Sequence, residues 1–225
     1  MHIGLIGGIG PAATEYYYRG LTDRHRAAGT SPELTIVHAD VRDLVRNLAN
    51  HDAHAQADIY LRLTQRLKAA GADAVAITSM GGHFCVGKFE SVSPLPILNA
   101  IPVVDTAIRQ QGFRTVGILG NMVVMRTRLY GGITSARIVL PEGEDLAAVH
   151  EAYREMALTA HVTDAQRRVF FSAGQRMCRE QGAEAVMLGG TDLFLAFDGL
   201  DCGFRIVDCA AIHIDSIYQS SSGAN

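Results

Sequence analysis

Short apolar runs alternate with longer segments of helical period along the whole chain. The short runs are bounded by glycine, proline or polar residues and predict strands at residues 2–7, 34–38, 74–77, 114–119, 136–140, 185–188 and 205–208. The longer segments, in which Ile59, Leu63 and Leu67 show the helical spacing, predict helices at residues 11–25, 43–50, 54–70, 146–158, 164–181 and 210–218. The polar residues 219–225 are expected to be frayed. Strands that alternate with helices in this way predict an α/β fold with parallel sheets.

Two stretches of the chain repeat one another. Residues 71–83 and 182–192 both read Gly-Ala-acid-Ala-Val, followed by an apolar pair and a turn of small residues. The repeat predicts two similar Rossmann-like α/β halves, one made of residues 1–100 with 209–225 and the other of residues 101–208. In open α/β sheets, ligands bind at the carboxyl ends of the strands. We therefore expect the two small-residue turns to face one cleft.

A glycine-rich turn follows the first strand, at residues 8–14. Pro11 suits the first turn of a helix, where its missing amide proton costs nothing. A glycine turn that leads into a helix N-terminus offers backbone amides to an anion. The turn has neither the glycine spacing of a dinucleotide-binding fold nor the Lys-Ser/Thr pair of a P-loop, so it does not identify the anion.

The composition narrows the class of protein. The chain has 225 residues, of which 48% are hydrophobic and 19% charged, and its net charge is -3. This balance, without a basic run, argues against partners such as nucleic acid or an anionic membrane. No apolar segment approaches the roughly 18 residues that span a bilayer, and no signal peptide is recognisable, which favours a cytoplasmic protein. In a cytosolic chain of this length the four cysteines are not expected to form disulfides, and because they lack CxxC spacing a zinc site is not expected either.

Four stretches of the sequence resemble the aspartate/glutamate racemase family. They are residues 3–14 with the following Tyr17-Tyr18-Arg19, the two repeats at 71–83 and 182–193, and residues 207–213. The resemblance spans nearly the whole chain and implies two pseudo-symmetric halves with the active site in the cleft between them. It also implies a homodimer and chemistry without metal or other cofactor. In that family, two cysteines on opposite sides of the substrate remove and return the α-proton beside a carboxylate.

This sequence departs from the family pattern at both cysteine positions. The first is Ser79, which is followed by Met80 and Gly81 in place of Asn and Thr, and the second is Gly190. A serine hydroxyl is a far weaker acid than a thiol. Ser79 is therefore a hydrogen-bond donor or a relay assisted by His83 or water, or it only fills the space of a thiol. Gly190 makes room for a bulkier group or exposes its amide, or it serves a tight turn.

The other catalytic candidates are Thr191, His83 and Cys209. Thr191 stands as it does in the family. His83 lies at the start of a helix, where it takes part in proton transfer or forms a structural bond to the loop, and His213 has the same two interpretations. Cys209 directly follows the last strand, so it reaches the strand edge unless it is a buried apolar residue.

The resemblance also implies a set of substrate-binding residues. They are Gly8, Gly10, Thr14, Arg42, Arg46, Thr78, Met80, Gly81, Asn121, Arg167 and Asp192. The N-terminal turn supplies amides and a hydroxyl, and the helix after the second strand supplies guanidinium groups for a carboxylate. Each arginine has the alternative of lying on a solvated helix face.

Three hypotheses for the function follow, each with a small carboxylate or amino acid as the partner. The first is a cofactor-independent enzyme that acts next to the carboxylate of a small amino acid or dicarboxylate, by one-face proton transfer, isomerisation, elimination or decarboxylation. The second is an Asp/Glu-type racemase with a non-standard acid/base pair, such as Ser79 with Cys209 or His83. The third is a catalytically inactive homologue that binds the ligand.

Overall fold

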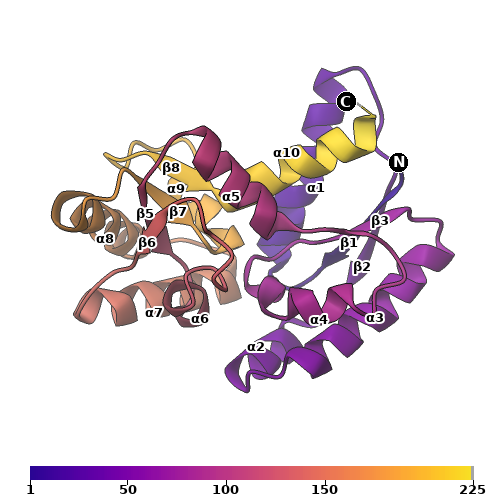
Figure 1. Cartoon of the computed structure of the whole chain (residues 1–225), viewed down its shortest axis with the longest axis horizontal. Coiled ribbons are helices and arrows are strands. Elements are labelled where there is room, and N and C mark those ends of the chain that lie inside the picture. Colours follow the sequence, from indigo (N-terminus) through magenta and orange to yellow (C-terminus); the bar gives the residue numbers. More distant parts are fainter. Residues whose placement is uncertain (224–225) are drawn as a thin grey trace. The chain divides into compact units, whose positions relative to one another are not determined.

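The chain forms two compact units, each built on one parallel sheet (Figure 1). The structure is a computed structural model that describes residues 1–223. The first unit comprises Met1–Ala100 and the residues from Ala210 onward, and the second comprises Ile101–Cys209. The expected boundary lay one residue earlier, before Cys209. Both sheets contain four parallel strands, so the expected α/β fold is confirmed.

The first unit orders its strands β2-β1-β3-β4. The strands are β1 at Ile3–Gly7, β2 at Leu34–His38, β3 at Ala74–Ile77 and β4 at Ile97–Leu98. The register pairs Gly7 with His38 and Ile6 with Ile77. Because the strands are parallel, β1, β2 and β3 all end at one edge of the sheet, and the segments that follow them meet there.

Helices cover both faces of the first sheet. They are α1 (Pro11–Ala27), α2 (Val41–Ala49), α3 (Ala53–Ala69), the 3₁₀ helix η1 (Gly81–Cys85), α4 (Val86–Glu90) and α10 (Cys209–Ser222). Tyr60, Leu67 and Phe89 of α3 and α4 pack into one core. Tyr17 and Ile214 pack into the other, where Figure 1 shows α10 beside α1. Although α10 follows the second unit in the chain, it completes the core of the first.

The second unit orders its strands β6-β5-β7-β8, the same arrangement with matching elements. The strands are β5 at Thr115–Leu119, β6 at Arg137–Val139, β7 at Ala185–Leu188 and β8 at Ile206–Asp208. The helices are α5 (Ala100–Gln110), α6 (Met122–Arg126), α7 (Glu144–Thr159), α8 (Asp164–Gln181), η2 (Thr191–Leu193) and α9 (Phe194–Phe197). Neither unit, over residues 1–223, contains a helix with the length and apolarity needed to cross a membrane.

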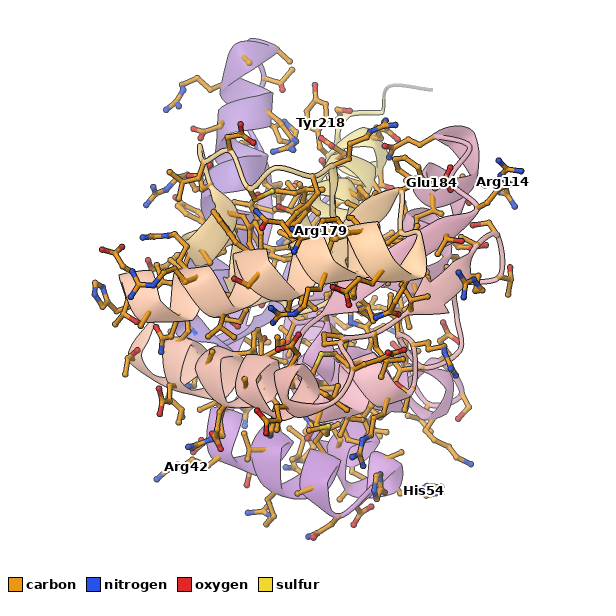
Figure 2. All side chains as sticks on the ribbon, turned by 90° about the vertical axis from the view of Figure 1, so that its left-hand side faces the viewer. Arg42, His54, Arg114, Arg179, Glu184 and Tyr218 are labelled. Carbon is orange, nitrogen blue, oxygen red and sulfur yellow. The ribbon has the colours of Figure 1, made fainter. Side chains whose placement is uncertain are left out.

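The acidic residue of each repeat has the same structural role. Asp73 Oδ2 accepts a hydrogen bond of 2.8 Å from the amide of His2, just before β1. Glu184 Oε2 accepts hydrogen bonds of 2.6 and 3.0 Å from the amides of Arg114 and Thr115, where β5 begins, and Figure 2 labels Glu184 beside Arg114. These two bonds hold the pKa of Glu184 below its ordinary value. Each carboxylate therefore ties its own strand to the neighbouring central strand.

The structure contains elements that the sequence pattern did not predict. Residues 97–104, expected to be a connection, hold β4 and the first turn of α5. Elements of two to five residues, such as β4, α4, α6 and α9, are too short to show a period. The predicted strands and helices otherwise agree with the observed bounds to within two residues, except at the end of the last helix.

That last helix, α10, continues to Ser222 instead of ending at Tyr218. The hydroxyls of Ser220 and Ser221 donate to carbonyls of the preceding turn at 3.0 and 2.9 Å. His25 Nε2 lies 2.9 Å from the hydroxyl of Ser221. The expected fraying is therefore wrong for residues 219–222, and residues 224 and 225 lie outside the described part of the chain.

A left-handed turn follows α6 in the second unit. Arg128, Leu129 and Tyr130 have φ values of 52, 55 and 60°, and Gly131 follows with 68°. Non-glycine residues rarely adopt this conformation, which costs about 1–2 kcal/mol per residue. Leu129 is fully buried, and its amide donates to the carbonyl of Val124 at 2.9 Å. Packing of Leu129 offsets the strain of the turn.

Candidate functional site

Ser79 stands beyond the end of β3, where its hydroxyl is held on one side. The amide of Gly82 donates to Ser79 Oγ at 3.3 Å. Thr78 Oγ1 donates to the carbonyl of Ile6 at 3.1 Å and so ties the turn to β1. Met80 is fully buried and Gly81 begins η1. Because Ser79 Oγ accepts from Gly82, its own proton is left for another acceptor.

His83 holds this turn in place through both ring nitrogens. Its Nδ1 donates to the carbonyl of Ser79 at 2.7 Å, and its Nε2 accepts from the amide of Ala100 at 3.4 Å. A ring that donates at Nδ1 and accepts at Nε2 is neutral. Burial lowers the pKa of His83 to about 4, in agreement with the neutral form. This geometry favours the loop-orienting role of His83 over proton transfer.

His213 on α10 is fixed in the opposite tautomer. Its Nε2 donates to the carbonyl of Leu98 at 2.7 Å, and its Nδ1 accepts from the hydroxyl of Tyr17 at 2.8 Å. Burial and the neighbouring His83 lower the pKa of His213 to about 3. The two imidazoles pack edge to face with ring centroids 5.9 Å apart. Together they join α10 to β4, α1 and the Ser79 turn.

The glycine-rich turn between β1 and α1 is braced by one hydroxyl. Thr14 Oγ1 accepts from the amide of Gly8 at 2.8 Å and donates to the carbonyl of Gly10 at 3.1 Å. It also lies 3.3 Å from Thr78 Oγ1, which links the turn to the end of β3. The helix α1 begins at Pro11, and Gly10, which precedes it at the N-cap position, supplies no side-chain cap. This N-terminus therefore presents backbone amides at the strand edge.

Gly8 lies directly against His38, a residue that the sequence analysis did not single out. Gly8 has a φ of 85°, and a side chain there would come within 2.4 Å of His38 Nδ1. His38 ends β2 and is exposed. A single exposed histidine at a strand end carries no sequence pattern, although its place beside the glycine turn follows from the predicted parallel sheet.

Arg42 and Arg46 lie on α2, which begins just after β2. Arg42 pairs with Asp40 at 2.6 Å and Arg46 with Asp43 at 2.6 Å. The Arg42 guanidinium and amide hold the pKa of Asp40 at about 2. The Arg42 side chain is 87% exposed, and Figure 2 shows it at the surface. The geometry matches the solvated-face interpretation for both arginines in this structure.

At the second strand end, the ring of Tyr153 occupies the space beside Gly190. A side chain at Gly190 would come within 2.2 Å of Tyr153 Cε2 and 2.8 Å of its hydroxyl. Gly190 has a φ of -115°, which any residue adopts, so the turn itself does not require glycine. The structure therefore supports the interpretation that Gly190 makes room for a bulkier group. That group is the ring of a tyrosine from α7 of the same unit.

Tyr153 is a neutral hydrogen-bond donor in this position. Its hydroxyl donates to Asp192 Oδ2 at 3.2 Å. Burial, followed by the charge of Asp192, raises the pKa of Tyr153 well above its ordinary value. Thr191 and Asp192 are both buried in η2. Sequence reasoning missed Tyr153 because its spacing on α7 indicates only a buried ring and does not say what the ring covers.

The start of α6 is capped by side chains of the second unit. Asn121 Oδ1 accepts from the amide of Val124 at 3.0 Å. His150, one turn before Tyr153 on α7, accepts at Nδ1 from the amide of Met122 at 3.2 Å. Asn121, a predicted substrate contact, therefore has its side-chain oxygen on its own helix. The helix α7 brings both His150 and Tyr153 to the edge where β5 and β7 end.

Of the two remaining candidates, Cys209 is buried and Arg167 has structural partners. Cys209 is fully buried, and burial together with the charge of Asp208 raises the pKa of its thiol well above the ordinary value. Arg167 pairs with Asp164 at 2.8 Å and donates to the carbonyl of Ala196 at 3.3 Å.

No group of three or more His, Cys, Asp or Glu side chains among residues 1–223 is placed to hold a metal ion.

Comparison with known proteins agrees with this geometry. A sequence model described as Asp/Glu/Hydantoin racemase matches residues 6–217. A proposed Asp/Glu racemase from Yersinia pestis is 24% identical, with a TM-score of 0.82 over 99% of this chain and 100% of that one. An aspartate racemase homologue from Pyrococcus horikoshii OT3 is 23% identical, with a TM-score of 0.80 over 98% and 99%. The Picrophilus torridus aspartate racemase is 16% identical, with a TM-score of 0.81 over 99% and 95%. At these identities the structural likeness establishes the fold.

Proposed function

The chain belongs to the Asp/Glu/hydantoin racemase family, and on this basis we propose that it is a cofactor-independent enzyme that has departed from two-cysteine racemisation. Its substrate is a small amino acid or dicarboxylate, and its chemistry takes place next to a carboxylate. The reaction is a one-face proton transfer or an isomerisation, elimination or decarboxylation that passes through the same charged intermediate.

One observation supports a reaction that does not use the two cysteines of the family. The space beside Gly190, the second cysteine position, is filled by the ring of Tyr153, which would have to move to admit a side chain there. A phenol whose pKa lies well above its ordinary value and that donates to Asp192 is a poor proton carrier at neutral pH. In this proposal the second cysteine position therefore supplies neither the acid nor the base that a racemase needs.

Ser79 acts in this proposal as a donor to developing charge. Its Oγ accepts from the amide of Gly82, so its proton points to a different acceptor. Removing a proton next to a carboxylate produces an enolate-like dianion, and hydrogen bonds aimed at that charge lower the barrier. A serine hydroxyl supplies such a bond without having to ionise.

The substrate carboxylate binds at the turn between β1 and α1 in this proposal. Thr14 fixes the loop of Gly8 and Gly10, and the N-terminus of α1 has no side-chain cap. Helix N-termini with available amides stabilise carboxylates. Arg42 and Arg46 contribute a second contact by leaving their aspartates, because exposed ion pairs are worth only about 0–1 kcal/mol. The further proposed contacts, from the second unit, are Asn121, Arg167, Thr191 and Asp192.

We further propose that the protein is cytoplasmic, and that it is a homodimer, as the family resemblance implies. Sedimentation at several concentrations tests the dimer, and a purely monomeric boundary at micromolar protein contradicts it.

Exchange in D₂O tests the reaction. The protein is incubated with the L and D forms of aspartate and glutamate, and the α-proton is followed by NMR. One-face chemistry predicts exchange with retained configuration, or a new product. Exchange with loss of optical purity instead identifies a racemase with a non-standard pair.

An inactive binding homologue is the second candidate, and one observation favours it. Both His83 and Cys209, the titratable proton carriers among the sequence candidates, are buried and uncharged. Such a protein shows no exchange and no product, and the ligand only raises its melting temperature.

A further inference from the structure

His38 places an exposed imidazole at the carboxyl edge of the first sheet. His38 ends β2 and pairs in register with Gly7 of β1. Ser79 stands beyond the end of β3 on the other side of β1. Strands in a sheet lie about 4.8 Å apart, so the ends of β2 and β3 are roughly 10 Å apart. A small carboxylate bound on the glycine turn after β1 would therefore lie between the ends of these two strands.

Gly8 determines where this imidazole lies. A side chain at Gly8 would come within 2.4 Å of His38 Nδ1 and 2.6 Å of His38 Cε1. Any other residue at Gly8 would displace the ring from the turn. Because Gly8 has no side chain, the imidazole can lie against the loop that is proposed to bind the carboxylate, with the Nδ1–Cε1 edge of the ring on the loop.

The bonding of His38 differs from that of the buried histidines. His25, His83 and His213 are buried, and each has hydrogen-bond partners at both ring nitrogens. Neither ring nitrogen of His38 has a hydrogen-bond partner among residues 1–223, and the residue is exposed. An accessible imidazole with a nitrogen lone pair free of protein partners has the chemistry of a general base.

We propose that His38 is a catalytic residue of this site, the base that removes the α-proton of the bound substrate. The inference rests on the proposed function. The Cα–H bond breaks and an N–H bond forms on the imidazole, while the electron pair delocalises into the substrate carboxylate. The Ser79 hydroxyl donates a hydrogen bond to the resulting charge. The imidazolium exchanges this proton with solvent and returns a solvent-derived proton to the same face, which regenerates the neutral base.

The test compares His38→Gln with His54→Gln, a matched change of an exposed histidine in the first turn of α3, which Figure 2 labels. L-aspartate, L-glutamate and malonate are offered in D₂O, and exchange is followed by NMR. General base catalysis typically contributes 10²- to 10⁴-fold, so kcat for exchange falls about 100-fold or more in His38→Gln. KM changes by less than about threefold, because glutamine fills similar space and the carboxylate contacts remain. His54→Gln keeps the wild-type rate.

A second readout follows the imidazole itself. In protein labelled with ¹³C at histidine Cε1, the signal that disappears in His38→Gln identifies His38. Saturation with the exchanged substrate moves this signal and leaves the His54 signal in place. Thermal melts of both variants confirm that they remain folded.

The possible results separate this inference from the proposed function. Wild-type exchange that persists in folded His38→Gln, or a His38 signal that does not respond to the exchanged substrate, overturns the role of His38 and leaves the proposed function standing. Absence of exchange and of product in the wild type with every carboxylate offered overturns both.

Discussion

The two units share a strand order but differ in how the helix after the first strand is capped. In the first unit, β1 leads into α1 through glycines, and no side chain caps the helix. In the second unit, β5 leads into α6 through Asn121, which caps it, while His150 accepts from the next amide. The N-terminus of α1 thus lacks a side-chain cap, while amides at the start of α6 are bonded to side chains of its own unit.

The glycines at the two edges show the same contrast. Gly8 makes room for the exposed ring of His38, and Gly190 makes room for the buried ring of Tyr153. The first ring is exposed, while the second is buried and bonded to Asp192. The two units thus share a sheet order but differ in what stands beside the glycine at the strand edge.

The largest expected effect on stability comes from removing the buried ring. Tyr153→Ala leaves a cavity beside Gly190 and should lower the free energy of unfolding by about 3–5 kcal/mol. His38→Ala, the corresponding change in the first unit, should cost less than about 0.5 kcal/mol because the ring is exposed. Urea denaturation of both variants measures the difference. Equal losses would mean that the two rings do not differ in structural role.

Acid should weaken the first unit before the second. The pKa values of His83 and His213, about 4 and about 3, lie below the ordinary value of 6.5. Below pH 6.5 the unfolded chain therefore binds protons that the folded unit does not bind. Stability is fully present above pH 6.5 and falls as the pH drops toward 4, by on the order of 3 kcal/mol for each of the two histidines.

Urea denaturation at pH 7, 5.5 and 4.5 measures this loss, and NMR signals of each unit show which one opens first. His213→Asn should flatten the dependence on pH, while His54→Gln should leave it unchanged. Simultaneous opening of both units, with the same slope in His213→Asn, would contradict the assignment.

A methyl group at the second strand end should be costly only while Tyr153 is present. Gly190→Ala forces the ring to move and should lower stability by about 1–3 kcal/mol. In a Tyr153→Ala background the same change should cost almost nothing, because the space is open. A double-mutant cycle measures this coupling. Additive effects would show that the ring and Gly190 are not in contact in solution.

The smallest expected effect concerns the helix cap. Asn121→Ala removes the oxygen that accepts from Val124 and should lower stability by about 1 kcal/mol. If the side chain serves only as a cap, exchange turnover by the wild type and the variant should agree. A fall in turnover without a fall in stability would instead make Asn121 a substrate contact.

Much of the fold could be predicted from the sequence because strands and helices leave periodic patterns. The repeated Gly-Ala-acid-Ala-Val also carried information, since Asp73 and Glu184 each bind the start of the neighbouring central strand. The very short elements could not be predicted in this way. The left-handed turn at Arg128–Tyr130 has no sequence signature either, because burial of Leu129 maintains it.

The positions of the candidate residues at strand ends could be predicted, but their surroundings could not. Ser79 and Gly190 stand where two strands end, as expected for parallel sheets. What fills the space at Gly190 depends on packing by Tyr153, 37 residues earlier in the chain, and no local pattern reports such a contact. The partners of Arg42 and the buried state of His83 likewise depend on three-dimensional surroundings.

The position of α10 sets the order in which the protein can be completed during synthesis. Residues 101–209 are contiguous and leave the ribosome as one finished unit. The first unit has to wait, because His213, Asp215 and Ser221 of α10 bind Tyr17, Arg24 and His25 of α1. The nascent first sheet therefore stays open along its α1 face while the whole second unit is translated. A chaperone that shields apolar surface has its natural period of action in that interval.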